Sequence, residues 1–107
     1  MELLYSRWVM AEELGYKPKT TFWQDFSIAD RFGITAIKDT FKRAFNEWKS
    51  DYIYLTELSM VLNHKSWQYQ DNTALCGLYA DLYYQVRDYA LDNLTGDELS
   101  YYLDTTD

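Results

Sequence analysis

Few residues in this 107-residue chain have the types and spacing that catalysis requires. The one histidine, His64, has no second histidine or nearby cysteine to share a metal ion, and the one cysteine, Cys76, has no evident base partner. A small residue such as Cys76 is more often a core residue than a nucleophile. A single cysteine forms no internal disulfide, which fits a reducing cytoplasm.

Any metal site would therefore have to consist of carboxylates. Paired acidic residues occur at Glu12–Glu13, Asp88–Asp92 and Asp97–Glu98. None of them follows the Glu-x-x-His spacing of the di-metal carboxylate bundles. The chain also has no glycine-rich phosphate loop and no evident Ser, His and Asp set. We expect a protein that is not an enzyme, with no catalytic residues, no metal and no cofactor.

The charge distribution offers a second kind of site. Residues 71–107 contain eight acidic residues and one basic residue, a net charge of −7 that equals the net charge of the whole chain. Asp81, Asp88 and Asp92 fall near one face of a helix, with axial steps of roughly 10 and 6 Å. The shorter step is comparable to the separation of neighbouring phosphates along a DNA strand. The face therefore imitates a nucleic-acid backbone, or it is simply solvated.

Aromatic residues add to this acidic region. Eleven tyrosines and four tryptophans exceed what one small core can hide, and exposed tyrosine is common at recognition surfaces. Adjacent residues such as Tyr83 and Tyr84 cannot both point inward from one helix. The alternative is that the rings pack at the core rim with their hydroxyls in water. We define the acidic surface, the predicted partner-binding site, as Asp81, Tyr83, Tyr84, Asp88, Asp92, Asp97 and Glu98.

The one basic segment, residues 31–49, has a net charge of +3 and looks like part of a helix-turn-helix. In that motif the second helix places apolar residues about ten and thirteen positions after an alanine of the first. Counting from Ala29, these positions are Asp39 and Lys42, which are charged. We therefore interpret the segment as an amphipathic helix and do not expect direct nucleic-acid binding. The alternative is a DNA-associated accessory factor that uses the face with Lys38, Lys42, Arg43 and Lys49.

Helical periodicity predicts the elements. We expect a helix over residues 2–14, then a connector over 16–26 in which Phe22, Trp23 and Phe26 contact the core. Ser27 is the expected N-cap of a short helix, with Asp30 at its third position, and Gly33 ends it. Further helices are predicted over about 36–49 (capped by Thr35), 52–68 (capped by Ser50 or Asp51), 73–94 and 97–103. A capping box of Thr95 and Glu98 would begin the last one.

The predicted fold class is all-α. With 48% hydrophobic residues, the chain has enough apolar material for a core, and its length suits one domain. We expect residues 1–107 to form a small single-domain helical bundle built around an antiparallel pair of long helices. The core stripe of the 36–49 helix is Ile37, Phe41, Ala44, Phe45 and Trp48; that of the 52–68 helix is Leu55, Leu58, Val61 and Leu62. No apolar run is long enough to cross a bilayer, so we expect a cytoplasmic protein.

Two stretches, FSIADRFGITAIKDTFKRAFNEWKSDYIYLTELSMVLNHKSW and GDELSYYLDTTD, resemble small uncharacterised proteins encoded on phages and conjugative elements of Gram-positive gut bacteria. The resemblance covers roughly residues 21–107 and implies a mobile-element accessory protein. By analogy of class, it suggests an inhibitor of host defence such as an anti-CRISPR or anti-restriction protein. The expected partner is then a protein with a basic surface, for example a host nuclease or CRISPR effector.

Overall fold

A computed structural model describes residues 22–106 of the protein, and this part of the chain forms five helices and no strand. The helices are α2 (Phe22–Asp30), α3 (Ile34–Trp48), α4 (Tyr52–Gln68), α5 (Thr73–Asn93) and α6 (Gly96–Thr106). The all-α prediction is confirmed. The predicted helix over residues 2–14 and the start of the connector, residues 16–21, lie outside the described residues. None of the five helices is long and apolar enough to span a membrane.

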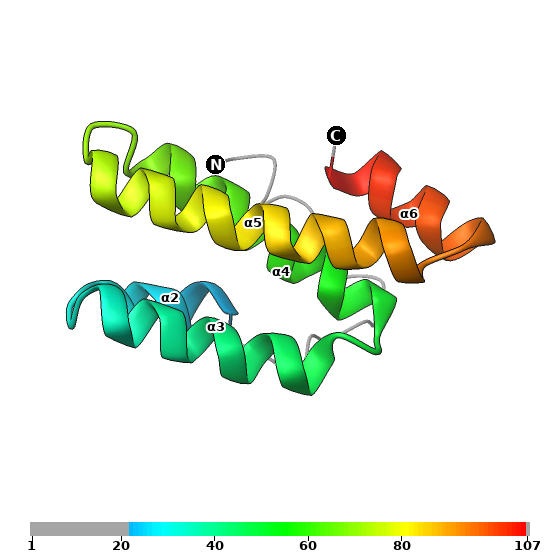
Figure 1. The fold of residues 1–107 in the computed structure, drawn as a ribbon, viewed down its shortest axis with the longest axis horizontal. Helices are drawn as coiled ribbons and strands as arrows, with labels where there is room; N and C mark the ends of the chain where they lie inside the picture. Colours follow the sequence, from blue (N-terminus) through cyan, green and yellow to red (C-terminus); the bar gives the residue numbers. More distant parts are fainter. Residues whose placement is uncertain (1–21, 107) are drawn as a thin grey trace, which may run out of the picture.

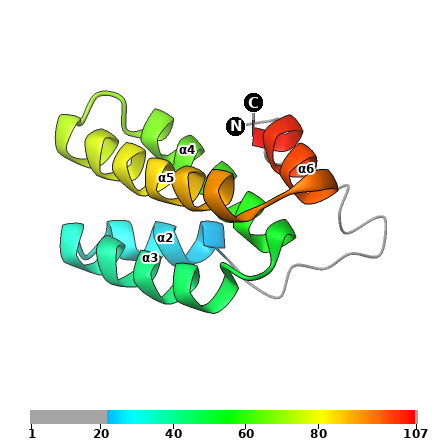
Figure 2. The ribbon, with the colours of Figure 1, turned by 45° about the vertical axis from the view of Figure 1, so that its right-hand side comes forward.

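The helices form two layers. α4 and α5 lie side by side, and the α2–α3 pair packs across them, while α6 folds back against one end of α4 (Figures 1 and 2). The core between the layers contains buried side chains from all five helices, among them Phe26, Ile37, Leu58, Val86 and Tyr102. The two longest helices, α4 and α5, belong to one layer, and their antiparallel orientation as the centre of the fold stays a prediction.

The connector predicted over residues 16–26 is wrong at its C-terminal end, because α2 begins at Phe22. Ser27 lies in the middle of this helix and is not its N-cap. Phe22, Phe26 and Ala29 recur at helical spacing and are all buried, so burial of this stripe favours helix over an extended connector. The helix ends at Asp30, and Gly33 follows with a φ of 104°, a conformation that favours glycine.

In α3 three residues of the predicted core stripe are buried, Ile37, Phe41 and Ala44, while Phe45 and Trp48 are partly buried against the core. The helix also starts earlier than predicted. Its N-cap is Gly33, without a side-chain cap, and Thr35 is already inside the helix. Ile37 and Phe41 are buried, while Asp39 and Lys42 are exposed. The positions that a helix-turn-helix would bury are therefore in solvent, so this segment does not have that motif's register.

Both long helices have a side-chain N-cap: Asp51, one of the two residues expected to cap α4, and Asn72, which was not predicted as a cap, at the start of α5. Asp51 Oδ1 accepts hydrogen bonds from the backbone N–H groups of Ile53 (3.1 Å) and Tyr54 (3.5 Å) at the start of α4. Asn72 Oδ1 accepts one from Leu75 N–H (3.2 Å) at the start of α5. These caps satisfy backbone donors that have no partner within the helix. The predicted core residues of α4 are all fully buried: Leu55, Leu58, Val61 and Leu62.

The last helix is longer than the predicted 97–103, because its C-terminal half packs against α4. Tyr102 is buried, and its hydroxyl shares a 2.7 Å hydrogen bond with Ser59 Oγ. The ring of Tyr101 meets the ring of Tyr52 edge-on, with centroids 5.4 Å apart. These contacts span 43 and 49 residues of sequence, so they are tertiary and could not be predicted from local periodicity.

We predict that Phe41→Ala lowers the free energy of unfolding by about 3–5 kcal/mol, because it removes a buried aromatic ring from the interface between the layers. The exposed neighbour Lys42→Glu is the matched control and should change stability little. Urea unfolding followed by circular dichroism measures both. Equal stability of the two variants would contradict the burial of the α3 stripe.

Candidate functional site

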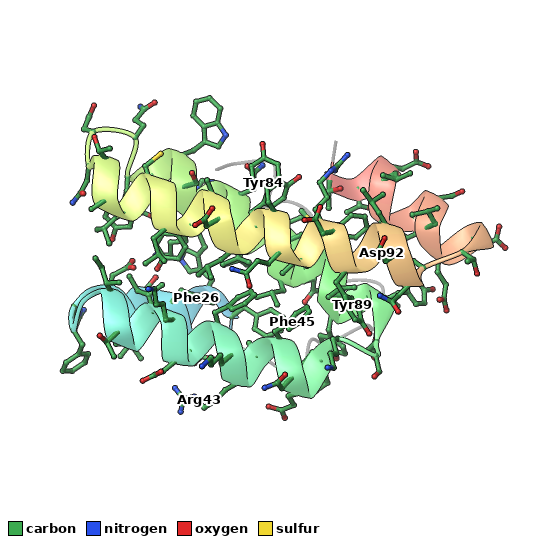
Figure 3. All side chains as sticks on the ribbon, viewed as in Figure 1. Phe26, Arg43, Phe45, Tyr84, Tyr89 and Asp92 are labelled. Atoms are coloured by element: carbon green, nitrogen blue, oxygen red, sulfur yellow. The ribbon has the colours of Figure 1, made fainter. Side chains whose placement is uncertain are left out.

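The acidic surface lies mainly on the outer side of α5. Asp81, Asp88 and Asp92 are exposed, as the helical spacing predicted, and recur along nearly one line of the helix surface. In Figure 3 the labelled Tyr84 and Asp92 project from α5 away from the α2–α3 layer, whereas Tyr89 projects toward it. The structure therefore gives α5 an acidic outer side and an aromatic inner side.

The two adjacent tyrosines have different environments. Tyr84 is 59% exposed, whereas Tyr83 is partly buried against the core. Their rings meet edge-on with centroids 5.3 Å apart, so Tyr83 supports the position of Tyr84. Seven residues after Tyr84, Leu91 is also exposed. Leu91 was not among the predicted site residues, although its spacing of seven residues from Tyr84 indicates that both lie on one side of α5.

The acidic residues of α6 extend the same region. Asp97 and Glu98 are exposed in the first turn of α6, four and five residues after α5 ends at Asn93. Gly96, with a φ of 58°, allows the sharp change of direction between the helices. Carboxylates at a helix N-terminus also interact favourably with the helix dipole. Asp97 and Glu98 thus stabilise α6 and add negative charge beside α5.

The basic residues occupy the opposite layer. Lys38, Lys42 and Arg43 are exposed on α3, and Arg43 points away from α5 in Figure 3. Lys49 is partly buried, with its ammonium group 5.8 Å from the centroid of the Phe45 ring. Exposed acidic residues, Asp39 and Glu47, alternate with these cations along α3. The face is therefore of mixed charge and not a continuous basic track.

The structure also contains a buried polar cluster that sequence analysis missed. We name it the polar clip and define it as Ser27, Asp30, Lys65, Tyr69 and Tyr79. Lys65 Nζ forms an ion pair with Asp30 Oδ2 (2.9 Å) and donates to Ser27 Oγ (2.9 Å). The Asp30 carboxylate also accepts hydrogen bonds from the hydroxyls of Tyr69 (2.7 Å) and Tyr79. The clip joins α2 to α5 and to the C-terminal end of α4. Lys65 lies in the last turn of α4, and Tyr69 directly follows that helix.

Burial and partners define the electrostatics of the clip. Lys65 is only 1% exposed, and its ammonium group lies 4.4 Å from the centroid of the Trp23 ring, a cation–π contact. Desolvation, aided by the hydrogen bond to the Asp30 carboxylate, raises the pKa of Tyr69 to about 12 and raises that of Tyr79 further. Both hydroxyls therefore stay protonated and donate to Asp30.

The polar clip is suited to holding helices together and not to catalysis. Its ammonium and carboxylate groups neutralise each other, and its two tyrosine hydroxyls are poor acids. One signal for it was available in the sequence. Lys65 continues the α4 core stripe, three residues after Leu62, so a lysine occupied a position where periodicity required a buried residue. The partner of Lys65, Asp30, was not identified from the sequence, because Asp30 was interpreted as part of a helix N-terminus.

Two further titratable groups lie on α4. Burial, with a smaller contribution from the Asp51 carboxylate, raises the pKa of Glu57 from 4.5 to about 7. Burial also lowers the pKa of His64, whose ring lies 4.8 Å from that of Trp23. Glu57 Oε2 and His64 Nε2 are buried without a hydrogen-bond partner. The described residues contain no group of three His, Cys, Asp or Glu side chains that could hold a metal ion.

For the polar clip, we predict that Lys65→Met lowers the free energy of unfolding by about 3–5 kcal/mol, because the Asp30 carboxylate is left buried without its counter-charge. The double variant Asp30→Asn/Lys65→Met should be more stable than Lys65→Met alone, since it removes that charge. Urea unfolding of wild type, Lys65→Met, Asp30→Asn and the double variant gives the coupling energy. Additive effects would mean that the pair is not coupled.

For Glu57, the raised pKa predicts a pH dependence of stability. Between pH 4.5 and about 7 the folded state keeps a proton that the unfolded state loses, so this contribution to stability is complete below pH 4.5 and is lost as pH rises toward 7. Glu57→Gln should match the wild type near about pH 4 and unfold at a higher temperature near about pH 8. The control Glu47→Gln, at an exposed position, should show no such divergence. Parallel melting curves for Glu57→Gln and wild type would contradict the assignment.

Comparison with known proteins adds no assignment to this geometry: no family model, no curated protein and no solved structure matches the chain.

Proposed function

We propose that the protein acts by binding another protein, through the acidic surface, at a site rich in Lys and Arg. One observation carries the proposal: Asp81, Asp88 and Asp92 are all exposed along one side of α5, beside the exposed ring of Tyr84. Carboxylates in this arrangement attract a basic surface, and an aromatic ring among them supplies contact area once water is excluded. Neither feature contributes to the core.

The two kinds of residue have separate roles in binding. The carboxylates act at long range, where they raise the rate of association with a positively charged partner. Tyr84 and Leu91 act at short range, where burial of their apolar area slows dissociation. Tyr83 contacts Tyr84 edge-on and so restricts its side-chain conformations before binding. Tyr84 therefore loses less conformational entropy when the partner binds. The rigid α5 scaffold fixes the spacing of all these groups.

The sharper form of the proposal is mimicry of nucleic acid. Asp88 and Asp92 are one helical turn apart, roughly 6 Å along the axis, and Asp97 and Glu98 continue the line of negative charge onto α6. Such a row would occupy a cleft that normally binds phosphates. The resemblance to mobile-element proteins then suggests a cytoplasmic inhibitor of a host defence nuclease, of the anti-CRISPR or anti-restriction class. Its partner would be a nuclease or CRISPR effector.

The alternative function, DNA association through Lys38, Lys42, Arg43 and Lys49, has less support. Asp39 and Glu47 are exposed among these cations and would face the same phosphates. Lys49 is partly occupied by its contact with Phe45. The net charge of −7 also repels a phosphate backbone at long range.

The experiment is a capture from lysate of a Gram-positive host, with wild type and Asp88→Lys/Asp92→Lys as parallel baits, followed by mass spectrometry. We expect proteins with basic clefts to be retained by the wild type and lost with the charge-reversed bait. With the purified partner, surface plasmon resonance should show a lower association rate for that variant and a faster dissociation for Tyr84→Ala. Binding should weaken as salt rises, and duplex DNA should compete.

The matched control is Lys38→Glu/Lys42→Glu, which changes charge on the opposite layer and should leave partner binding unchanged. Circular dichroism should show that all variants are folded, since each position is exposed. Equal affinity and equal salt dependence of wild type and Asp88→Lys/Asp92→Lys would reject the acidic surface as the binding site.

A further inference from the structure

The outer side of the α2–α3 pair contains a groove of about 900 Å³, on the layer opposite the acidic surface. Its walls come from α2 and α3, with apolar side chains such as Phe22, Ala36 and Trp48 along its length. At one end, the turn between the helices presents Phe32, which is 77% exposed, the largest exposure among the large hydrophobic residues of the described chain. Ile28 and Ile34 beside it are also exposed.

The apolar features of this face are arranged as a projection and a recess. Phe32 lies at the end of the groove that precedes α3, and the recess formed by Phe22, Ala44 and Trp48 lies toward the end of α3. From Ile34 to Trp48 the helix is roughly 21 Å long. A two-fold axis over the middle of α3 would therefore place Phe32 of one copy at the recess of the other, and the reverse contact follows by symmetry.

The charges on the rim of the groove are also self-complementary under this two-fold axis. Asp39 and Arg43 line the groove four residues apart, and both are exposed. Within the described chain neither has an ion-pair partner. With the axis midway between them, Asp39 of each copy faces Arg43 of the other, so one two-fold operation forms two ion pairs. The charged residues that line the groove are Asp25, Asp39, Lys42, Arg43 and Glu47, with a net charge of −1, so this face repels its own copy less than the acidic surface would.

We propose that this groove is a homodimer interface, in which two copies of the chain pack α3 against α3 in antiparallel fashion and exchange Phe32. Each copy buries an exposed aromatic ring and closes the other's groove. The two acidic surfaces then lie on the outer sides of the dimer, because α5 is on the layer opposite the groove. The proposal goes beyond the proposed partner binding and does not depend on it.

Sedimentation equilibrium of the full chain tests the interface. We expect a monomer–dimer equilibrium in the wild type, weakened at least about thirtyfold in Phe32→Glu, the loss typical of a buried aromatic anchor. Arg43→Asp should weaken it as well, because two carboxylates then face two carboxylates across the axis. The swapped variant Asp39→Arg/Arg43→Asp should restore dimerisation. Asp88→Lys, on the acidic surface, should dimerise as the wild type does.

A photo-crosslinking amino acid at position 32 identifies what occupies the groove. In a mixture of isotope-labelled and unlabelled chains, we expect crosslinks between copies that join position 32 to residues near Trp48. A chain that stays monomeric at millimolar concentration would overturn the proposal, as would a dimer unaffected by Phe32→Glu and Arg43→Asp. Crosslinks from position 32 to residues 1–21 of the same copy would assign the groove to the chain's own N-terminal segment and would overturn it too.

Discussion

The burial of one ion pair constrains the rest of this fold. Removing the Lys65 ammonium from water costs several kcal/mol, and the loss is offset only if its partners are in place. Those partners come from other helices: Asp30 and Ser27 from α2, with Tyr79 from α5 completing the coordination of Asp30. The relative positions of α2, α4 and α5 are therefore fixed together. A shift of α2 along its axis would separate Asp30 from Lys65 and leave both charges without partners.

Around this fixed centre the two layers present different surfaces. The α5–α6 side is acidic, with an exposed tyrosine and leucine among carboxylates, while the α2–α3 side combines an apolar groove with charges of both signs. The polar clip and the core residues hold the layers face to face, so the two surfaces are directed away from each other. One side can contact a partner while the other contacts a second molecule.

Much of the helical framework was predictable, because its signals are local. Asp51, one of the two residues expected to cap α4, begins that helix, and Leu55, Leu58, Val61 and Leu62 are buried as their spacing predicts. The start of α2 was missed, since nothing local distinguishes a buried helical Phe22 from a buried residue in a connector. The exposure of Asp81, Asp88 and Asp92 was predictable from periodicity. The Asp30–Lys65 pair was not, because it joins residues 35 positions apart in the sequence. The α2–α3 groove was not, because residues 22–26 were expected to be a connector, so the helix that forms one wall of the groove was not predicted in full.

The clip also limits the order in which parts of the chain can pack during folding. Asp30 contacts residues 35, 39 and 49 positions later in the sequence, so closing these contacts fixes long loops and costs chain entropy that local helix formation does not. During synthesis, the α2–α3 hairpin has no complete set of partners until Tyr79 has left the ribosome. Until α5 has been synthesised, apolar residues of α2 and α3 such as Phe26 and Ile37 therefore stay exposed. Docking of these helices is expected to be the slow step of folding, even though each helix forms quickly.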